Sequence, residues 1–257
     1  LFKLKEKILK AIATKYKNKL LELYKKYENR TINSTYVKKE LFDIKNRQIK
    51  NTCLSILSRL ETQDIHDLIK EQYNSSENFS DKMAAFSLYL KSSAKDKLDL
   101  LNKEQIKAEK NLVHYETFLN IVGLNESSDS IEIIKQVEKS KAFKIEQTNS
   151  TRALYSTFAS NKHKSLLTEE GLDYLTDILI KLSKVNEYVS VQIINKIFGK
   201  IDFLEKIDQV RIVKSIMELF KTLDKNKTPS VYNTVERLLN NSKKAVKSYK
   251  ISAGKRV

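Results

Sequence analysis

Residues 168–182 read TEEGLDYLTDILIKL, and this stretch decides the fold class. Its apolar side chains recur three or four residues apart, at Leu172, Leu175, Ile178, Leu179 and Leu182. That spacing places them on one face of an α-helix. Glu169 and Glu170 stand at the start of the stretch, where negative charge favours a helix N-terminus. We therefore predict a helix that begins at Thr168–Gly171 and turns its apolar face inward.

The same spacing recurs along the rest of the chain and predicts roughly twelve helices with short connections, as in stacked antiparallel helix pairs. A polar break is expected over 29–35, a loop over 74–78 and irregular chain over 143–149, after which Asn149 or Thr151 is a candidate helix cap. The last helix is expected to begin at Pro229. The other predicted helices cover about 2–28, 41–57, 65–73, 80–90, 95–101, 108–122, 130–137, 154–158, 189–198, 201–204 and 209–223.

The scarcity of glycine and proline supports an all-α fold. The 257 residues include four glycines and one proline, whereas sheets need these residues at many turns. No fixed-period repeat stands out, so any stack of helix pairs is irregular. We expect residues 1–257 to form a single helical domain.

The single cysteine and the chain's beginning set further bounds. Cys53 alone excludes an internal disulfide and a cysteine-based zinc site, and its place in a helical apolar stripe predicts a buried, unreactive side chain.

No apolar run approaches ~18 residues, so no membrane span is expected. The chain lacks an initiator methionine, and we expect it to be part of a longer polypeptide. A cytoplasmic location is favoured, with an upstream targeting signal as the alternative.

The net charge of +16 does not predict nucleic-acid binding. A nucleic-acid interface gathers lysine and arginine on one face together with stacking aromatic residues. Here the lysines occur in nearly every segment and alternate with acids, which is typical of solvated helix faces. The densest basic stretch, Lys243–Lys250, fits a C-terminal helix whose cations lie near its carbonyl end.

No complete catalytic motif occurs in the sequence. His66, His114 and His163 are far apart and none has a partner one helical turn away, so no H-E-x-x-H zinc site is present. Phosphate-binding glycine loops and a G-x-S-x-G elbow are also missing. We expect no catalytic residues and no metal in this chain.

An ordered series of segments resembles the C-terminal helical domain of the aminopeptidase N-type zinc metallopeptidases, which are gluzincins, in particular the bacterial and apicomplexan type. The segments follow one another over about residues 1–225. The most specific is NFSDKMAAF at 78–86, similar to the family's N-M-T-D-x-x-A-A-L. The others are the first helix (5–24), DIKNRQIKNTCL (43–54), QY (72–73), FKIEQTNSTRAL with FA (143–159) and GLDYL (171–175).

The resemblance implies an armadillo- or HEAT-like stack that acts as a cap. In such enzymes zinc is held by a separate upstream domain, which carries H-E-x-x-H and a distal glutamate. The helical domain encloses the active-site chamber and limits access to peptides. The implied partners are thus the catalytic domain of the same polypeptide and peptide substrates, and the implied cofactor is zinc in that domain.

The resemblance also singles out Arg152 as a substrate-binding residue. It matches the second arginine of the family's N-P-N-R-x-R motif, although it could instead pair with an acid or with loop carbonyl groups. Other polar positions of the family are replaced here. Ser150 stands for the first arginine, Ser190 for a glutamine and Ile194 for an arginine, while Val189 and Thr117 replace a proline and a tryptophan.

Two functions therefore remain open at the level of the sequence. The first is a non-catalytic cap and gate of a zinc aminopeptidase, which predicts no peptidase activity in the isolated chain and a partly apolar docking face. The second is an independent helical-repeat scaffold that binds a protein or an acidic partner through its positive surface.

Overall fold

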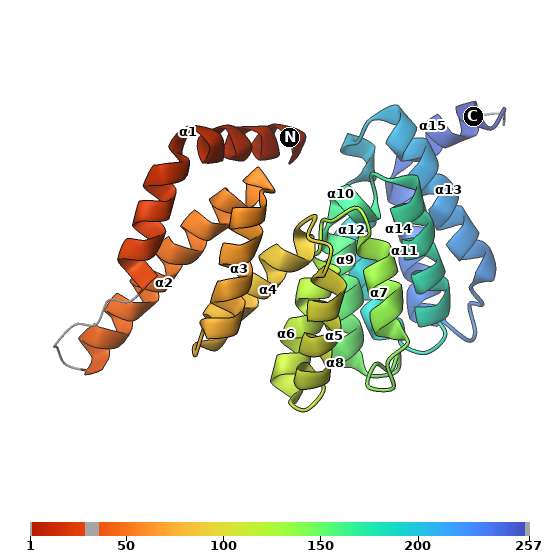
Figure 1. Ribbon diagram of the computed structural model, residues 1–257. Helices are drawn as coiled ribbons and strands as arrows, with labels where there is room; N and C mark the ends of the chain where they lie inside the picture. Colours follow the sequence, from red (N-terminus) through yellow and green to blue (C-terminus); the bar gives the residue numbers. More distant parts are fainter. Residues whose placement is uncertain (1, 29–35, 255–257) are drawn as a thin grey trace. The chain divides into compact units, whose positions relative to one another are not determined.

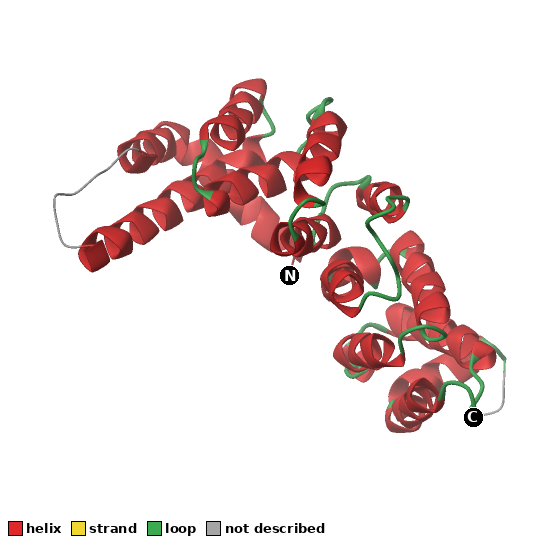
Figure 2. Ribbon diagram, turned by 90° about the horizontal axis from the view of Figure 1, so that it is seen from below, coloured by secondary structure: helices red, strands yellow, loops and turns green. Residues whose placement is uncertain are grey.

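The computed structural model describes residues 2–28 and 36–254, and all regular elements in those residues are helices (Figures 1 and 2). The predicted all-α class is therefore confirmed. The chain divides into two compact units, Leu1–Gln105 and Ile106–Val257. The expectation of one domain over 1–257 stays a prediction, and each unit is described by itself below.

The first unit is built from long helices that pack in pairs. Helix α1 packs on α2, and α3 packs on α4. The elements are α1 (Phe2–Glu28), α2 (Tyr36–Leu57), η1 (Ser58–Leu60), α3 (Gln63–Ser75), α4 (Phe79–Lys91) and α5 (Lys97–Ala108), the last of which reaches the boundary between the units.

Helix α1 has the predicted bounds but is not straight. The backbone at Tyr16 leaves helical geometry, with φ −116° and ψ 22°, and Figure 1 shows the helix in two segments at an angle. Burial of α1 begins just before this kink, at Ala13, and continues after it. Leu20 and Tyr24 lie in the core, whereas Leu4 and Ile8 are 58% and 51% exposed. The helix predicted over 2–28 thus leaves the apolar side chains near its N-terminus largely exposed.

A buried polar network joins the helices of the first unit. The ammonium group of Lys50 lies 2.6 Å from Asp81, and both side chains are only 7% exposed. Asn51 donates to the same carboxylate over 2.7 Å. Gln72 donates to the side-chain oxygen of Asn51 and accepts a hydrogen bond from the hydroxyl of Tyr24, each over 2.9 Å. Helices α1 to α4 each contribute to this network, so it fixes their relative positions.

The segments that carried the family resemblance supply most of this network. Lys50 and Asn51 lie in DIKNRQIKNTCL, Gln72 in QY, and Asp81 in NFSDKMAAF. Cys53, in the first of these segments, is buried as predicted and is 5% exposed. These segments therefore have a structural role in the core of the unit.

The second unit contains the remaining helices. They are α6 (Leu112–Gly123), α7 (Ser130–Glu138), α8 (Thr148–Thr151), η2 (Arg152–Ser156), α9 (Thr157–Ser160), α10 (Lys162–Ser165), α11 (Glu169–Leu182), α12 (Glu187–Phe198), η3 (Ile201–Phe203), α13 (Lys206–Thr222), α14 (Pro229–Asn241) and α15 (Lys243–Ser252).

These helices form two stacked rows. Helix α6 contacts η2, η2 contacts α12, and α12 contacts α14. In the other row α11 contacts α13, and α13 contacts α15. Contact between alternate helices of the chain is the arrangement of a helical-repeat stack, in which each pair buries its apolar face against the next. The predicted irregular stack of helix pairs is confirmed.

Several predicted helix ends are confirmed and others need correction. Thr168 caps α11, its hydroxyl accepting from the amide of Gly171 over 3.1 Å, and Pro229 opens α14. The caps proposed at Asn149 and Thr151 are wrong, because α8 begins at Thr148 with Gln147 before it. The helix predicted over 108–122 starts only at Leu112, and a break at Ser242 separates α15 from the helix that Pro229 begins.

Candidate functional site

Arg152 lies at the start of a π-helical turn. The segment η2 (Arg152–Ser156) joins α8 to α9, and such π turns occur frequently at functional sites. The side chain of Arg152 is exposed, and its guanidinium donates to Oδ1 of Asn149 over 3.4 Å. The guanidinium is thus held lightly, by a neighbour in its own turn, and retains donors for another group.

The packing of α6 fixes the position of this turn. Thr157 donates its hydroxyl hydrogen to carbonyl groups of the π turn, at Ala153 and Leu154. Gly123, the last residue of α6, lies against these groups. A Cβ atom there would be 2.1 Å from Oγ1 of Thr157 and 2.4 Å from the carbonyl oxygen of Leu154. Only glycine therefore allows α6 to approach the turn so closely.

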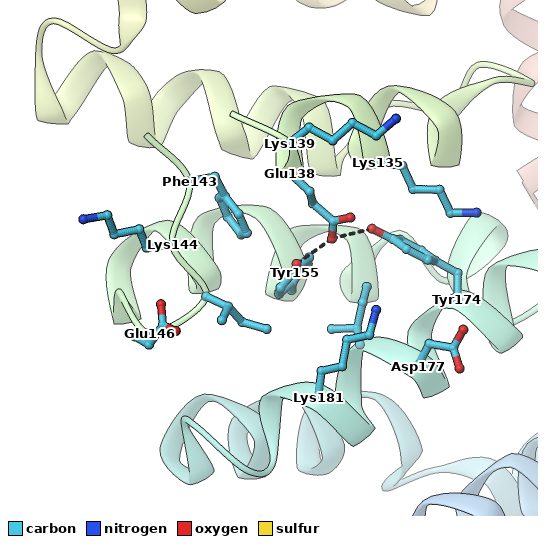
Figure 3. Close-up of a pocket in the computed structure, with 12 residues that line it drawn as sticks. Lys135, Glu138, Lys139, Phe143, Lys144, Glu146, Tyr155, Tyr174, Asp177 and Lys181 are labelled. Atoms are coloured by element: carbon cyan, nitrogen blue, oxygen red, sulfur yellow. Dashed lines mark hydrogen bonds between the residues drawn. The ribbon is translucent and has the colours of Figure 1, made fainter. Parts of the chain in front are cut away.

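A pocket of about 650 Å³ opens beside the π turn, between α7, η2 and α11 (Figure 3). At its centre is the carboxylate of Glu138, the last residue of α7. Oε1 of Glu138 accepts hydrogen bonds from the hydroxyls of Tyr155, over 2.5 Å, and Tyr174, over 2.7 Å. We call this the Glu138 pocket. Its aromatic and aliphatic lining consists of Phe143, Ile145, Tyr155, Tyr174 and Ile178.

The two tyrosines are held as neutral hydrogen-bond donors. Burial, followed by the nearby Glu138 carboxylate, raises the pKa of Tyr155 above its usual range. The same causes, in the same order, raise the pKa of Tyr174. The ring of Phe143 meets Tyr155 edge-on at 5.5 Å, which limits the movement of that ring. The pocket therefore presents a carboxylate whose orientation is fixed from two sides.

Charged side chains surround this carboxylate. The lining holds four lysines and, besides Glu138, two acids, so cations are in the majority. Nζ of Lys135 lies 5.3 Å from the centre of the Tyr174 ring, over its face. In Figure 3 Lys181 extends from α11 toward Glu138, whereas Lys139 and Lys144 point away. The charged lining residues are Lys135, Glu138, Lys139, Lys144, Glu146, Asp177 and Lys181.

The positions that the resemblance paired with Arg152 lie elsewhere. Ser150, Ser190 and Ile194 are at most 2% exposed and face the core of the second unit. Val189 is fully buried, and Thr117 on α6 bonds to the carbonyl group of Val113. The structure therefore does not gather these positions around Arg152 in an exposed site.

The histidines do not form a metal centre. His66 is buried and lies 3.1 Å from the Glu61 carboxylate, and His114 and His163 belong to the second unit. Among the described residues no three histidine, cysteine, aspartate or glutamate side chains are placed to share a metal ion. These residues do not fit a zinc ion. In the same residues, every helix is too short or too polar to cross a bilayer.

Comparison with known proteins identifies the family. A family model described as "Domain of unknown function (DUF3458_C) ARM repeats" matches residues 1–246.

The chain belongs to the DUF3458_C family.

Curated relatives of this DUF3458_C domain are much longer proteins. The chain is 23% identical over 239 residues to aminopeptidase N of Escherichia coli K12, a match that covers 91% of the chain and 26% of that protein. It is 24% identical over 194 residues to aminopeptidase N of Haemophilus influenzae, covering 71% of the chain and 22% of that protein. The recognition of the chain as a C-terminal helical domain of the aminopeptidase N type is confirmed.

A solved structure shows the same fold. Aminopeptidase A of Legionella pneumophila, solved in complex with aspartic acid, matches with a TM-score of 0.80 at 18% identity. The match covers 92% of this chain and 28% of that one. The DUF3458_C chain therefore spans about a quarter of the length of the proteins that it matches.

The sequence singled out Arg152, whose role stays a prediction, but gave no sign of the Glu138 pocket. Glu138 lies 17 residues before Tyr155 and 36 before Tyr174, so no local motif joins the three. The one available signal was the helical spacing that turns Tyr155 and Tyr174 inward with their apolar neighbours, because a buried tyrosine hydroxyl usually has a partner.

Proposed function

We propose that this chain is the non-catalytic cap and gate of a zinc-dependent aminopeptidase, which removes N-terminal residues from peptides. The observation that carries the proposal is the extent of the match to aminopeptidase N. It covers 91% of this chain but only 26% of the relative, so most of the relative lies outside the matched region. Zinc and its ligands would belong to that other part of the polypeptide.

A helical stack suits the role of a cap for a physical reason. Its two rows of helices make a broad, stiff wall, because each helix pair is buried against the next. A wall over an active site excludes bulk water and admits only chains that can enter the enclosed chamber. The parent enzyme would therefore act on short peptides in preference to folded proteins.

Exposed apolar side chains support a docking face for the catalytic domain. Leu4 and Ile8 on α1 and Leu41 and Ile44 on α2 are between 37% and 58% exposed. Helices α1 and α2 pack on each other, so these side chains belong to neighbouring elements. Large exposed apolar groups gathered on neighbouring elements are typical of interfaces. The remaining three quarters of an aminopeptidase N-length chain could cover this face.

Arg152 is the residue of this chain that we propose to contact substrate. Its guanidinium is exposed and, among residues 2–28 and 36–254, has a single weak partner in Asn149, so it could donate two parallel hydrogen bonds to a peptide carboxylate. The π turn and the close approach of Gly123 hold its backbone in place. A contact of this kind would orient a peptide beyond the bond that is cleaved.

The test is steady-state kinetics of the full polypeptide with di- and tripeptides. Arg152→Ala is expected to lower kcat/KM by an amount equivalent to about 1–3 kcal/mol, the range for a hydrogen bond to a charged group. Arg237→Ala is the matched control, because Arg237 is also exposed and donates to an asparagine, Asn195. Unchanged kcat/KM in Arg152→Ala, or an equal loss in both variants, would refute the contact.

A further inference from the structure

Two opposite charges face each other across the Glu138 pocket without forming an ion pair. Glu138 projects from the end of α7, and Lys181 extends toward it from α11 on the opposite wall (Figure 3). Within 2–28 and 36–254, neither side chain has an ion-pair partner. A carboxylate and an ammonium group that share a pocket in this way leave room for a molecule between them.

The carboxylate of Glu138 is held ready to accept another hydrogen bond. Both tyrosine hydroxyls donate to Oε1. Oε2 accepts no hydrogen bond from the described part of the chain. The tyrosines use their only hydrogens on Glu138, so a further donor at Oε2 must be another group, such as the ammonium group of a ligand. An ammonium group is the donor that a carboxylate between aromatic rings favours most.

The lysines of the pocket favour an anionic group in the same ligand. Among the described residues Lys181 has no acidic partner. In the same residues, the ammonium group of Lys135 contacts only the face of the Tyr174 ring. A cation alone would be repelled by these ammonium groups, and an anion alone would be repelled by Glu138. A ligand with both charges satisfies both walls, while Phe143 and Ile178 can cover its apolar stem.

We propose that the Glu138 pocket binds a small zwitterion, such as a free amino acid or a dipeptide. Its ammonium group would donate to Oε2 of Glu138, and its carboxylate would pair with Lys181. The volume of about 650 Å³ accommodates a molecule of this size. The proposal concerns binding within the second unit and does not depend on the role of the chain as a cap.

The first test is an NMR titration of the isotope-labelled chain with four small probes. β-Alanine and glycylglycine carry both charges at two separations, propionate lacks the ammonium group, and propylamine lacks the carboxylate. We expect saturable shifts of α7 and α11 amides with at least one zwitterion, with Kd on the order of 1 mM. Propionate and propylamine should bind at least about tenfold more weakly, since each lacks one charged contact.

Variants then assign the two contacts. Glu138→Gln keeps an acceptor for both tyrosine hydroxyls but loses the negative charge, and Lys181→Gln removes the facing cation. Each should weaken zwitterion binding by about tenfold or more. Lys184→Gln, at the exposed end of the same region and outside the pocket lining, should leave the affinity unchanged. Circular dichroism and amide spectra of each variant check that the fold is intact.

Three results would overturn the proposal. One is the absence of saturable shifts with both zwitterions. Another is binding of propionate or propylamine as tight as that of the better zwitterion, which would indicate a simple ion site. The third is unchanged zwitterion affinity in folded Glu138→Gln or Lys181→Gln, which would place the bound molecule elsewhere.

Discussion

At the scale of single residues, the buried ion pair between Lys50 and Asp81 joins two helices of the first unit, α2 and α4. Both side chains are 7% exposed, and Asn51 completes the coordination of the carboxylate. Such a pair adds little net stability by itself, because both charges lose their hydration. Removal of one partner is costly, since it leaves the other charge buried and uncompensated.

We therefore predict that Asp81→Ala lowers the free energy of unfolding by about 3–5 kcal/mol. The control is Asp64→Ala, which breaks the exposed ion pair with Lys17. The Asp64 carboxylate is 56% exposed, so this variant should lower the free energy of unfolding by no more than about 1 kcal/mol. Urea unfolding followed by circular dichroism measures both. Equal losses in the two variants would mean that the buried network does not specify the unit.

The tyrosines of the Glu138 pocket predict a loss of stability at alkaline pH. Burial and the Glu138 carboxylate raise the pKa of Tyr155 and Tyr174 in the folded chain above the value of about 10 expected when unfolded. A pKa raised by folding means that the neutral form is favoured in the folded state. This contribution is complete below about pH 10 and is lost as pH rises toward the folded pKa values.

The free energy of unfolding should accordingly fall as pH increases above about 10. Urea unfolding at a series of alkaline pH values measures the slope. In the double variant Tyr155→Phe, Tyr174→Phe the slope should be shallower, because two of the groups that ionise on unfolding are gone. An identical slope in the double variant would show that these hydroxyls do not resist ionisation.

Sequence reasoning at this scale works where the deciding neighbours are local. Cys53 was correctly predicted to be buried, because the apolar spacing of its own helix decides its burial. The ion pair of Lys50 and the carboxylate of Glu138 could not be predicted, because their partners lie 31, 17 and 36 residues away. Their identity depends on which helices become neighbours, which no single sequence pattern specifies.

At the scale of helices and turns, the close packing of α6 against the π turn is a tight constraint within the second unit. A methyl group at Gly123 would collide with the carbonyl oxygen of Leu154, a backbone atom that cannot move aside by rotation of a side chain. The contact therefore couples the end of α6 to the turn that carries Arg152.

Gly123→Ala should lower the free energy of unfolding by about 1–3 kcal/mol, the usual cost of overpacking. Leu112→Ala on the same helix is the control. That side chain is 64% exposed, so its loss should change stability by less than about 0.5 kcal/mol. Thermal or urea unfolding compares the two variants. A stability of Gly123→Ala equal to that of the control would mean that α6 is free to shift.

Some helix ends can be predicted from the residues next to them in the sequence. Thr168 and Pro229 were predicted correctly because each acts within its own first turn. The N-terminus of α14 has a second support that no local pattern reveals. Glu187 accepts hydrogen bonds from the amides of Ser230 and Val231, more than forty residues further along. The kink of α1 at Tyr16 was likewise absent from the predicted apolar spacing.

At the scale of the whole molecule, composition was enough to predict the fold class but not the function. Four glycines and one proline in 257 residues exclude a turn-rich sheet, and the observed stack of helices follows. The family was predicted from the order of the sequence segments that resemble it. The segments around Asn51 and Asp81 lie in the core of the first unit. The proposed gate would act together with a zinc-binding region elsewhere in the longer polypeptide that we propose.

The most direct test of the cap is hydrolysis by the full polypeptide that contains this chain. The measurement compares kcat/KM for a tripeptide with kcat/KM for a small folded protein that has a free N-terminus, with the isolated chain as the blank. We predict zinc-dependent hydrolysis of the tripeptide, none of the folded protein and none by the isolated chain. Equal rates on both substrates, no peptidase activity in the full polypeptide, or zinc-dependent turnover by the isolated chain would contradict it.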